Sequence, residues 1–158
     1  MKRGFGLAVL IVVGCTGCAG SDPGWEKPQR DFKQFQSDVY PVLLRDCAFS
    51  TCHGSPDRFF RIWGPGRTRL DPMTRAFDTL TGAEAANTFQ LALSMIDSRE
   101  PSRSPLLRKP LAVAAGGANH LGADSFGRNI YRTVNDPGYV TLSRFVLGTA
   151  PTAQPQQP

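Results

Sequence analysis

The chain has 158 residues, and its 18 Lys and Arg against 13 Asp and Glu give a formal net charge of +5 at pH 7. Lys2 and Arg3 lie in a segment that we expect to be removed, so the mature chain is only mildly basic and its charge gives no case for binding nucleic acid. The roughly 120 residues between its polar ends are enough for one small domain and too few for two.

Residues 1–18 have the pattern of an export signal. Two basic residues precede an apolar run over residues 5–13, which is about half as long as a helix that spans a bilayer. The flanks of Cys15 resemble a bacterial lipobox, in which a cysteine is lipidated and becomes the mature N-terminus. We expect the lipid on Cys15, with Cys18 as the alternative. The competing interpretation is an ordinary secretory signal with incidental cysteines.

Two polar segments flank the part of the chain that we expect to fold. Residues 19–31 are rich in Gly, Pro and charge, which is typical of a flexible tether. Residues 149–158 form a Pro- and Gln-rich tail that has nothing to bury, so we expect it to be disordered. The domain is therefore expected over residues 32–148.

The domain is expected to open with a helix that leads directly to Cys47. Asp31 can cap this helix, and its apolar residues recur at three- and four-residue spacing. They are Phe32, Phe35, Val39, Val42 and Leu43. Pro41 lies within the stripe and lacks a backbone donor, so we expect a kink or a break there.

The most informative motif follows, Cys47-Ala48-Phe49-Ser50-Thr51-Cys52-His53. In the haem attachment signature C-x-x-C-H, two thiols add to the haem vinyl groups and the adjacent imidazole becomes an axial iron ligand. Here four residues separate the cysteines, so the backbone between them must bulge outward if both sulfurs are to reach one ring. Thiols rarely stay free outside the cytoplasm, which leaves haem attachment, a disulfide or a metal site.

The next segment, residues 54–75, has few periodic apolar residues and is expected to form a loop. It contains five arginines with little acidic company. They are Arg58, Arg61, Arg67, Arg69 and Arg75. Such a patch is expected either to pair with haem propionates or an acidic redox partner, or to be a solvated basic loop.

Thr81 and Glu84 form a capping box at the start of an apolar-periodic segment that ends at Ile96, which is the clearest helix signal in the chain. Residues 100–109 are expected to return to loop.

A Gly-rich turn is expected around His120, and a closing helix from Tyr139 that stops at Gly148. No stretch alternates like a strand. The sequence therefore predicts a mostly α domain with long loops, whose core is thin unless a cofactor fills it.

Only two histidines are available as axial ligands, and ligation by His53 and His120 is the sharpest hypothesis. Met73, in a loop, and Met95, on the apolar face of a helix, are the alternatives to His120. Two other interpretations of the cysteines remain open. One is a Cys47–Cys52 disulfide, and the other is a zinc site formed by both cysteines and both histidines.

Three motifs in matching order resemble the cytochrome c-like domains of exported bacterial proteins, including those described as Planctomycete-type cytochrome C. Residues 35–43 (FQSDVYPVL) precede the cysteine motif, residues 104–111 (SPLLRKPL) follow it, and residues 116–122 (GGANHLG) flank the later histidine with glycines. The chain departs from the family in its four-residue spacer, where two residues are usual, and in Ala123, where a second glycine is common.

The resemblance implies one haem c bound covalently through Cys47 and Cys52, with His53 as proximal and His120 as distal ligand. It implies a small cytochrome c-like helical domain that exchanges electrons with a redox partner protein and is not itself an enzyme. With the signal, it places the protein in the bacterial cell envelope, lipid-anchored to a membrane and facing the periplasm. The alternative is a haem-free structural or binding lipoprotein with a Cys47–Cys52 disulfide.

Overall fold

The computed structural model describes residues 29–120 and 129–149. The expected export signal, both candidate lipidated cysteines (Cys15 and Cys18) and Ala123 lie outside the described residues. So do residues 19–28 of the expected tether and residues 150–158 of the expected tail.

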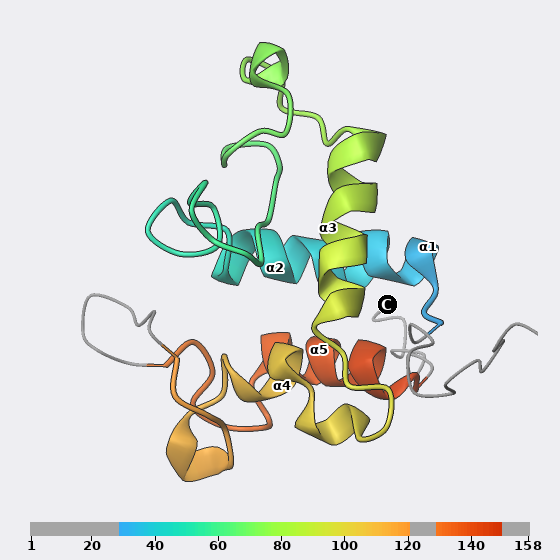
Figure 1. The fold of residues 1–158 in the computed structure, drawn as a ribbon, viewed down its shortest axis with the longest axis vertical. Coiled ribbons are helices and arrows are strands. Elements are labelled where there is room, and N and C mark those ends of the chain that lie inside the picture. The colour runs from blue at the N-terminus through green and yellow to red at the C-terminus, as the bar shows by residue number, and fades with distance from the viewer. Residues whose placement is uncertain (1–28, 121–128, 150–158) are drawn as a thin grey trace, which may run out of the picture.

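The described residues form helices and helical turns without a strand, which confirms a mostly α fold (Figure 1). Leu111 and Tyr131 form one isolated parallel bridge. In order, the elements are α1 (Phe32–Gln34), η1 (Phe35–Val39), α2 (Tyr40–Asp46), η2 (Pro72–Thr74), α3 (Gly82–Ser94), η3 (Pro101–Arg103), α4 (Pro105–Arg108), η4 (Val113–Ala115) and α5 (Pro137–Leu147). None of the described helices is long and apolar enough to cross a membrane.

The elements α1, η1 and α2 form one continuous rod that ends directly before Cys47. Asp31 caps it as expected, because its carboxylate accepts the Gln34 N–H at 2.5 Å. The expected break at Pro41 takes the form of a π turn, in which the Tyr40 N–H bonds to the Phe35 carbonyl. Proline lacks a donor and crowds the carbonyl four residues earlier, and a wider turn relieves both problems without ending the helix.

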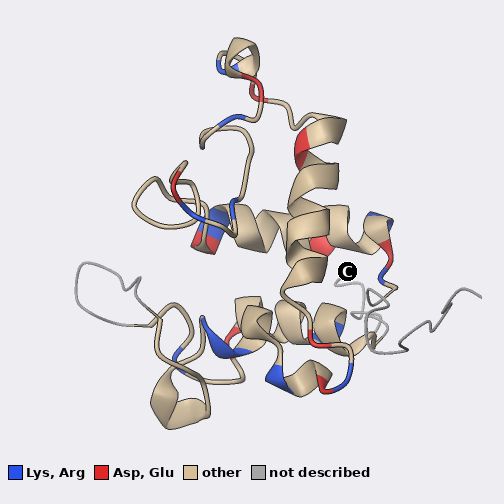
Figure 2. Ribbon diagram, viewed as in Figure 1, with Lys and Arg blue, Asp and Glu red and all other residues tan. Residues whose placement is uncertain are grey.

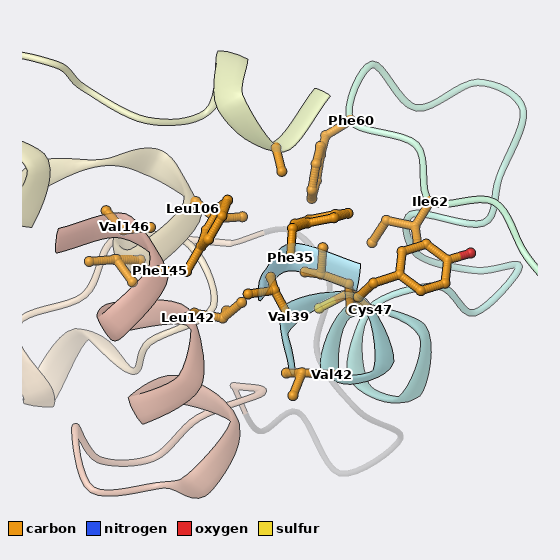
Figure 3. Packing of buried hydrophobic residues seen from close by; sticks show 14 of the residues in the cluster. Phe35, Val39, Val42, Cys47, Phe60, Ile62, Leu106, Leu142, Phe145 and Val146 are labelled. Carbon is orange, nitrogen blue, oxygen red and sulfur yellow. The ribbon is translucent and has the colours of Figure 1, made fainter. Parts of the chain in front are cut away.

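Phe35 is fully buried at the centre of the core. Its ring centroid lies 5.1 Å from that of Phe89 on α3 and 5.6 Å from that of Phe145 on α5. Figure 3 shows Phe35 between the α5 side chains and those of Phe60 and Ile62. Aromatic pairs at these separations add about 0.5–1.5 kcal/mol each beyond their burial, so Phe35 joins three helical segments.

The capping box at the start of α3 is present in full. The Thr81 hydroxyl accepts the Glu84 N–H at 3.2 Å, and the Glu84 carboxylate accepts the Thr81 N–H at 3.0 Å. Glu84 has a second role that its sequence position does not reveal. It is buried and paired with buried Arg69 through two bonds of 2.7 and 2.9 Å.

Arg69 uses its remaining donors on backbone carbonyls of the loop before α3. It donates to Thr74 O at 2.9 Å, Phe77 O at 2.5 Å and Thr79 O at 2.9 Å. The expectation of a five-arginine surface patch is therefore wrong for Arg69, which ties the loop of residues 70–79 to α3. The other arginines carry no such buried ion pair among the described residues.

Residues 100–109 are not the loop that the sequence predicts, because they contain η3 and the one-turn helix α4. Pro105 occupies the first position of α4, where its fixed φ suits a helix and its missing N–H is not needed. Buried Ser104 precedes it and accepts the Asp97 N–H at 3.0 Å. A four-residue helix is too short to show a periodic apolar pattern, so it left no signal in the sequence.

The closing helix α5 begins at Pro137, two residues before the expected Tyr139, and stops at Gly148 as expected, where φ is 70°. Arg30, expected in the flexible tether, donates to the carbonyls of Phe145 and Val146 at 2.7 and 2.5 Å. A guanidinium at a helix C-terminus satisfies carbonyls that lack partners within the helix. Arg30, at the end of the expected tether, thus contacts the C-terminal end of α5.

The buried Arg69–Glu84 pair yields a stability prediction. Burial raises the pKa of Glu84, but bonds from Arg69, Thr81 and Leu70 outweigh it and hold the pKa at about 2, below the ordinary 4.5. The ionised carboxylate thus stabilises the fold above about pH 4.5, and this contribution is lost as the pH falls towards 2. We expect Glu84→Gln to lower the free energy of unfolding by about 3 kcal/mol at pH 7, because Arg69 is left buried without a counter-charge.

Urea unfolding between pH 7 and 2.5 tests this expectation. The difference in free energy of unfolding between the unmodified chain and Glu84→Gln should shrink as the pH falls below 4.5. The matched control is Glu100→Gln, which breaks an exposed 3.1 Å pair with Arg103 and should cost less than about 1 kcal/mol. Equal losses in the two variants would contradict the importance of the buried pair.

Candidate functional site

A cavity of about 250 Å³ lies between the end of α2, α4, the end of α3 and α5. The four residues predicted as haem attachment points or iron ligands, Cys47, Cys52, His53 and His120, all line it. So does Met95, whereas Met73 lies in η2 with 84% of its surface exposed and does not line the cavity. The remaining lining is largely apolar and comprises Leu43, Asp46, Arg58, Phe60, Pro105, Leu106, Lys109, Pro110, Ile130 and Leu142.

The loop from Cys47 to His53 is closed at its base by backbone bonds. The His53 N–H donates to Cys47 O at 3.0 Å, and the N–H groups of Cys52 and Gly54 donate to Phe49 O at 2.8 and 2.9 Å. The side chains at positions 49–51 are exposed, so the additional spacer residues bulge away from the cavity. Cys47 and Cys52 thus both reach the cavity in spite of the long spacer.

Cys47 is buried directly after the end of α2. Burial, and to a smaller extent the charge of Asp46, raises the pKa of its thiol to about 12. The thiol is therefore protonated at neutral pH.

His53 is oriented by a backbone carbonyl. Its Nδ1 lies 2.6 Å from Phe60 O, and its ring packs edge-on against the Phe60 ring at 5.0 Å. A carbonyl can only accept, so Nδ1 carries the proton and Nε2 has the lone pair that a metal needs. Burial lowers the pKa of His53, and the neighbouring His120 and Arg58 lower it further, which favours the neutral imidazole that ligates metals.

His120 faces His53 across the cavity. The two ring centroids are 5.8 Å apart and the ring planes are inclined by 32°. Two imidazoles on opposite sides of one metal ion have centroids about 6 Å apart, because each metal–nitrogen bond is about 2 Å long. The two imidazoles are therefore close enough that both could hold one metal ion.

Backbone contacts hold the segment before His120 against α4. The Ala118 N–H donates to Arg108 O at 2.7 Å, and the Lys109 ammonium donates to Asn119 O at 3.1 Å. Gly117 is required for this approach, because a Cβ at its position would lie 1.9 Å from Leu111 O. The Gly-rich turn thus serves close packing beside the site.

The cationic residues do not form the single patch that the sequence suggested. Of the five arginines, only Arg58 lines the cavity, together with Lys109. Arg67 lies 4.4 Å above the Phe49 ring and donates to Leu44 O at 3.2 Å, and Arg61 lies 4.8 Å above the Trp63 ring. Figure 2 shows basic residues distributed over the molecule and interspersed with acidic ones.

Cys47 and Cys52 are free thiols in the structure, with no disulfide between them. Within residues 29–120 and 129–149, no group of three or more His, Cys, Asp or Glu side chains is arranged to hold a metal ion. Comparisons of the chain with protein-family models, curated proteins and solved structures find no match.

Several residues at the site were missed by sequence reasoning. The Phe60 carbonyl and the Tyr131–Asp46 bond act through contacts between distant segments, which no local pattern reports. Lys109 was assigned to a loop without a role. It lies within residues 104–111, the segment given above for the family resemblance, and that place is a signal that could have singled it out.

The closure of the cysteine loop leads to a second stability prediction. A Cβ on Gly54 would lie 2.3 Å from Ala48 O and 2.9 Å from Phe49 O, both backbone atoms. We expect Gly54→Ala to lower the free energy of unfolding by about 1–3 kcal/mol, because the loop must open to admit the methyl group. Gly82→Ala is the matched control. It adds the same methyl group at the start of α3 with no atom within 4 Å, and should leave stability unchanged or slightly raised.

Thermal unfolding followed by circular dichroism measures both variants. A Gly54→Ala protein as stable as the control would show that the tight closure around residues 48–54 is not needed.

Proposed function

We propose that residues 32–148 form a cytochrome c-like domain that binds one haem c and transfers electrons. The observation that carries the proposal is the convergence of Cys47, Cys52, His53 and His120 on one cavity, with the two imidazoles 5.8 Å apart. Thiols for covalent attachment and two imidazoles for axial ligation are the donor set that a c-type haem requires.

The chemistry of the cavity fits this group. Cys47 and Cys52 would form thioether bonds, and His53 and His120 would be the axial ligands. Bound haem would supply a one-electron couple between ferric and ferrous iron. The Phe60 carbonyl orients His53 and increases its basicity, while the apolar lining from Leu43, Leu106 and Leu142 excludes water.

The two basic side chains at the cavity have a role in the same proposal. Arg58 and Lys109 come from different segments, and both line the cavity. A guanidinium and an ammonium group are suited to pair with the two haem propionates. In this proposal the protein is an electron carrier without catalytic activity, and it exchanges electrons with a redox partner protein. A lipid on Cys15 or Cys18 would anchor it to a membrane of the bacterial cell envelope, where it faces the periplasm.

Covalent haem is the first test. The full chain, expressed in a host with a haem-attachment system, should keep haem on a denaturing gel and stain for it. Single variants Cys47→Ser and Cys52→Ser should each retain haem through one remaining thioether, at reduced yield. The double variant should lose the stain completely, because no covalent bond is left.

The same gel distinguishes the alternative function. A chain that shows no haem stain, and that by mass spectrometry is lighter by two hydrogen atoms than its reduced form, would contradict the proposal. It would favour a haem-free lipoprotein with a Cys47–Cys52 disulfide.

The distal ligand is tested by His120→Ala. We expect the Soret and visible bands to change from those of six-coordinate low-spin iron to those of a high-spin form, because one strong-field nitrogen ligand is lost. Met95→Leu and Met73→Leu are the controls and should leave the spectrum unchanged. A spectrum that changes in Met95→Leu and not in His120→Ala would assign the distal position to Met95.

A further inference from the structure

A side-chain hydrogen bond connects the two sides of the cavity. The Tyr131 hydroxyl donates to Asp46 Oδ2 at 2.9 Å. Asp46 directly precedes Cys47 at the end of α2, and it also lines the cavity. Arg45 donates to both carboxylate oxygens of Asp46 at 2.6 and 2.8 Å, so the acceptor is held in a fixed orientation.

The Tyr131 side of this bond is continuous with the segment that carries His120. The Tyr131 N–H donates to Pro110 O, and Tyr131 O accepts the Ala112 N–H, both at 2.9 Å. Ala112 O in turn accepts the Gly117 N–H at 3.0 Å, three residues before His120. The path from Asp46 to the His120 segment therefore consists of one side-chain bond followed by backbone bonds.

The environment of the bond keeps it intact. Tyr131 is 4% exposed, and burial, with the nearby Cys47 and Asp46, raises the pKa of its hydroxyl, so it stays a donor. Gly138 on α5 lies directly against the bond. A Cβ there would lie 2.7 Å from the Tyr131 hydroxyl and 2.8 Å from Asp46 Oδ2.

We propose that the Asp46–Tyr131 bond is a clasp that sets the separation between the cysteine motif and the His120 segment, which makes Tyr131 a positioning residue for the distal ligand. The inference rests on the proposed haem function. Without the clasp, the His120 segment keeps its bonds to α4, but its distance from Cys47 and His53 is no longer fixed. Haem remains covalently attached, and distal ligation weakens.

The test uses the full chain with attached haem. In Tyr131→Phe, which removes only the hydroxyl, we expect unchanged haem staining and a larger five-coordinate fraction in the visible spectrum. We also expect carbon monoxide, which must displace the distal ligand, to bind the ferrous protein about tenfold faster, the factor typical of losing one hydrogen bond to a charged group. Gly138→Ala should act in the same direction, although alanine is the better helix residue.

Tyr139→Phe is the matched control, because it removes a hydroxyl from the neighbouring ring, whose centroid lies 6.0 Å from that of Tyr131. It should bind carbon monoxide at the unmodified rate. Asp46→Ala combined with Tyr131→Phe should have no larger effect than Asp46→Ala alone, since Asp46→Ala already removes the acceptor of the Tyr131 bond.

Two results would overturn the inference in different ways. Stained haem with unchanged carbon monoxide binding in both Tyr131→Phe and Gly138→Ala would refute the clasp alone. Absence of haem from the unmodified chain would refute the proposed function, and the role of the clasp with it.

Discussion

The contact of Phe35 with Phe89 and Phe145 is the interaction on which the rest of the structure depends. Each ring belongs to a different helical segment, and the segments have no strand pairing among the described residues to hold them together. The burial of these aromatic rings fixes the first half of the rod formed by α1, η1 and α2 relative to α5. The cavity lies between these two elements, so its shape follows from where Phe35 packs.

The two sides of the cavity are built by different means. The cysteine side is formed locally, because a helix end and a loop closed by its own backbone bonds present Cys47, Cys52 and His53 within seven positions of each other. The His120 side has no regular helix at the histidine itself. It depends on a short helix, an isolated bridge and close packing at Gly117, and therefore on contacts between segments.

This difference explains what could be predicted from the sequence. The Asp31 cap, the Thr81 capping box and the stop at Gly148 are encoded by neighbouring residues, and all three are confirmed. The π form of the turn before Pro41, the helix α4 and the burial of Arg69 were not predicted. The helix α4 is too short to show a periodic pattern, and the burial of Arg69 depends on Glu84, which lies 15 residues later in the chain.

The same distinction applies to the candidate site. Its four candidate haem-binding residues were proposed from residue types and order, and the structure brings all four to one cavity, while it separates Met73 from them. Their binding of haem remains a proposal. The contacts around these residues could not be found from residue type. Phe60 contacts His53 through its backbone carbonyl, which every residue has. Tyr131 contacts Asp46 through its hydroxyl, and most buried tyrosine hydroxyls have a hydrogen-bond partner.

The outward bulge at positions 49–51 has a consequence for the length that this loop can have. Because the closing bonds join Cys47 to His53 and Phe49 to Cys52 and Gly54, the ends of the loop are fixed while residues 50 and 51 face solvent. Loop length costs little free energy per added residue. A residue inserted beside Ser50 would therefore lengthen only the exposed part of the loop and leave both cysteines at the cavity.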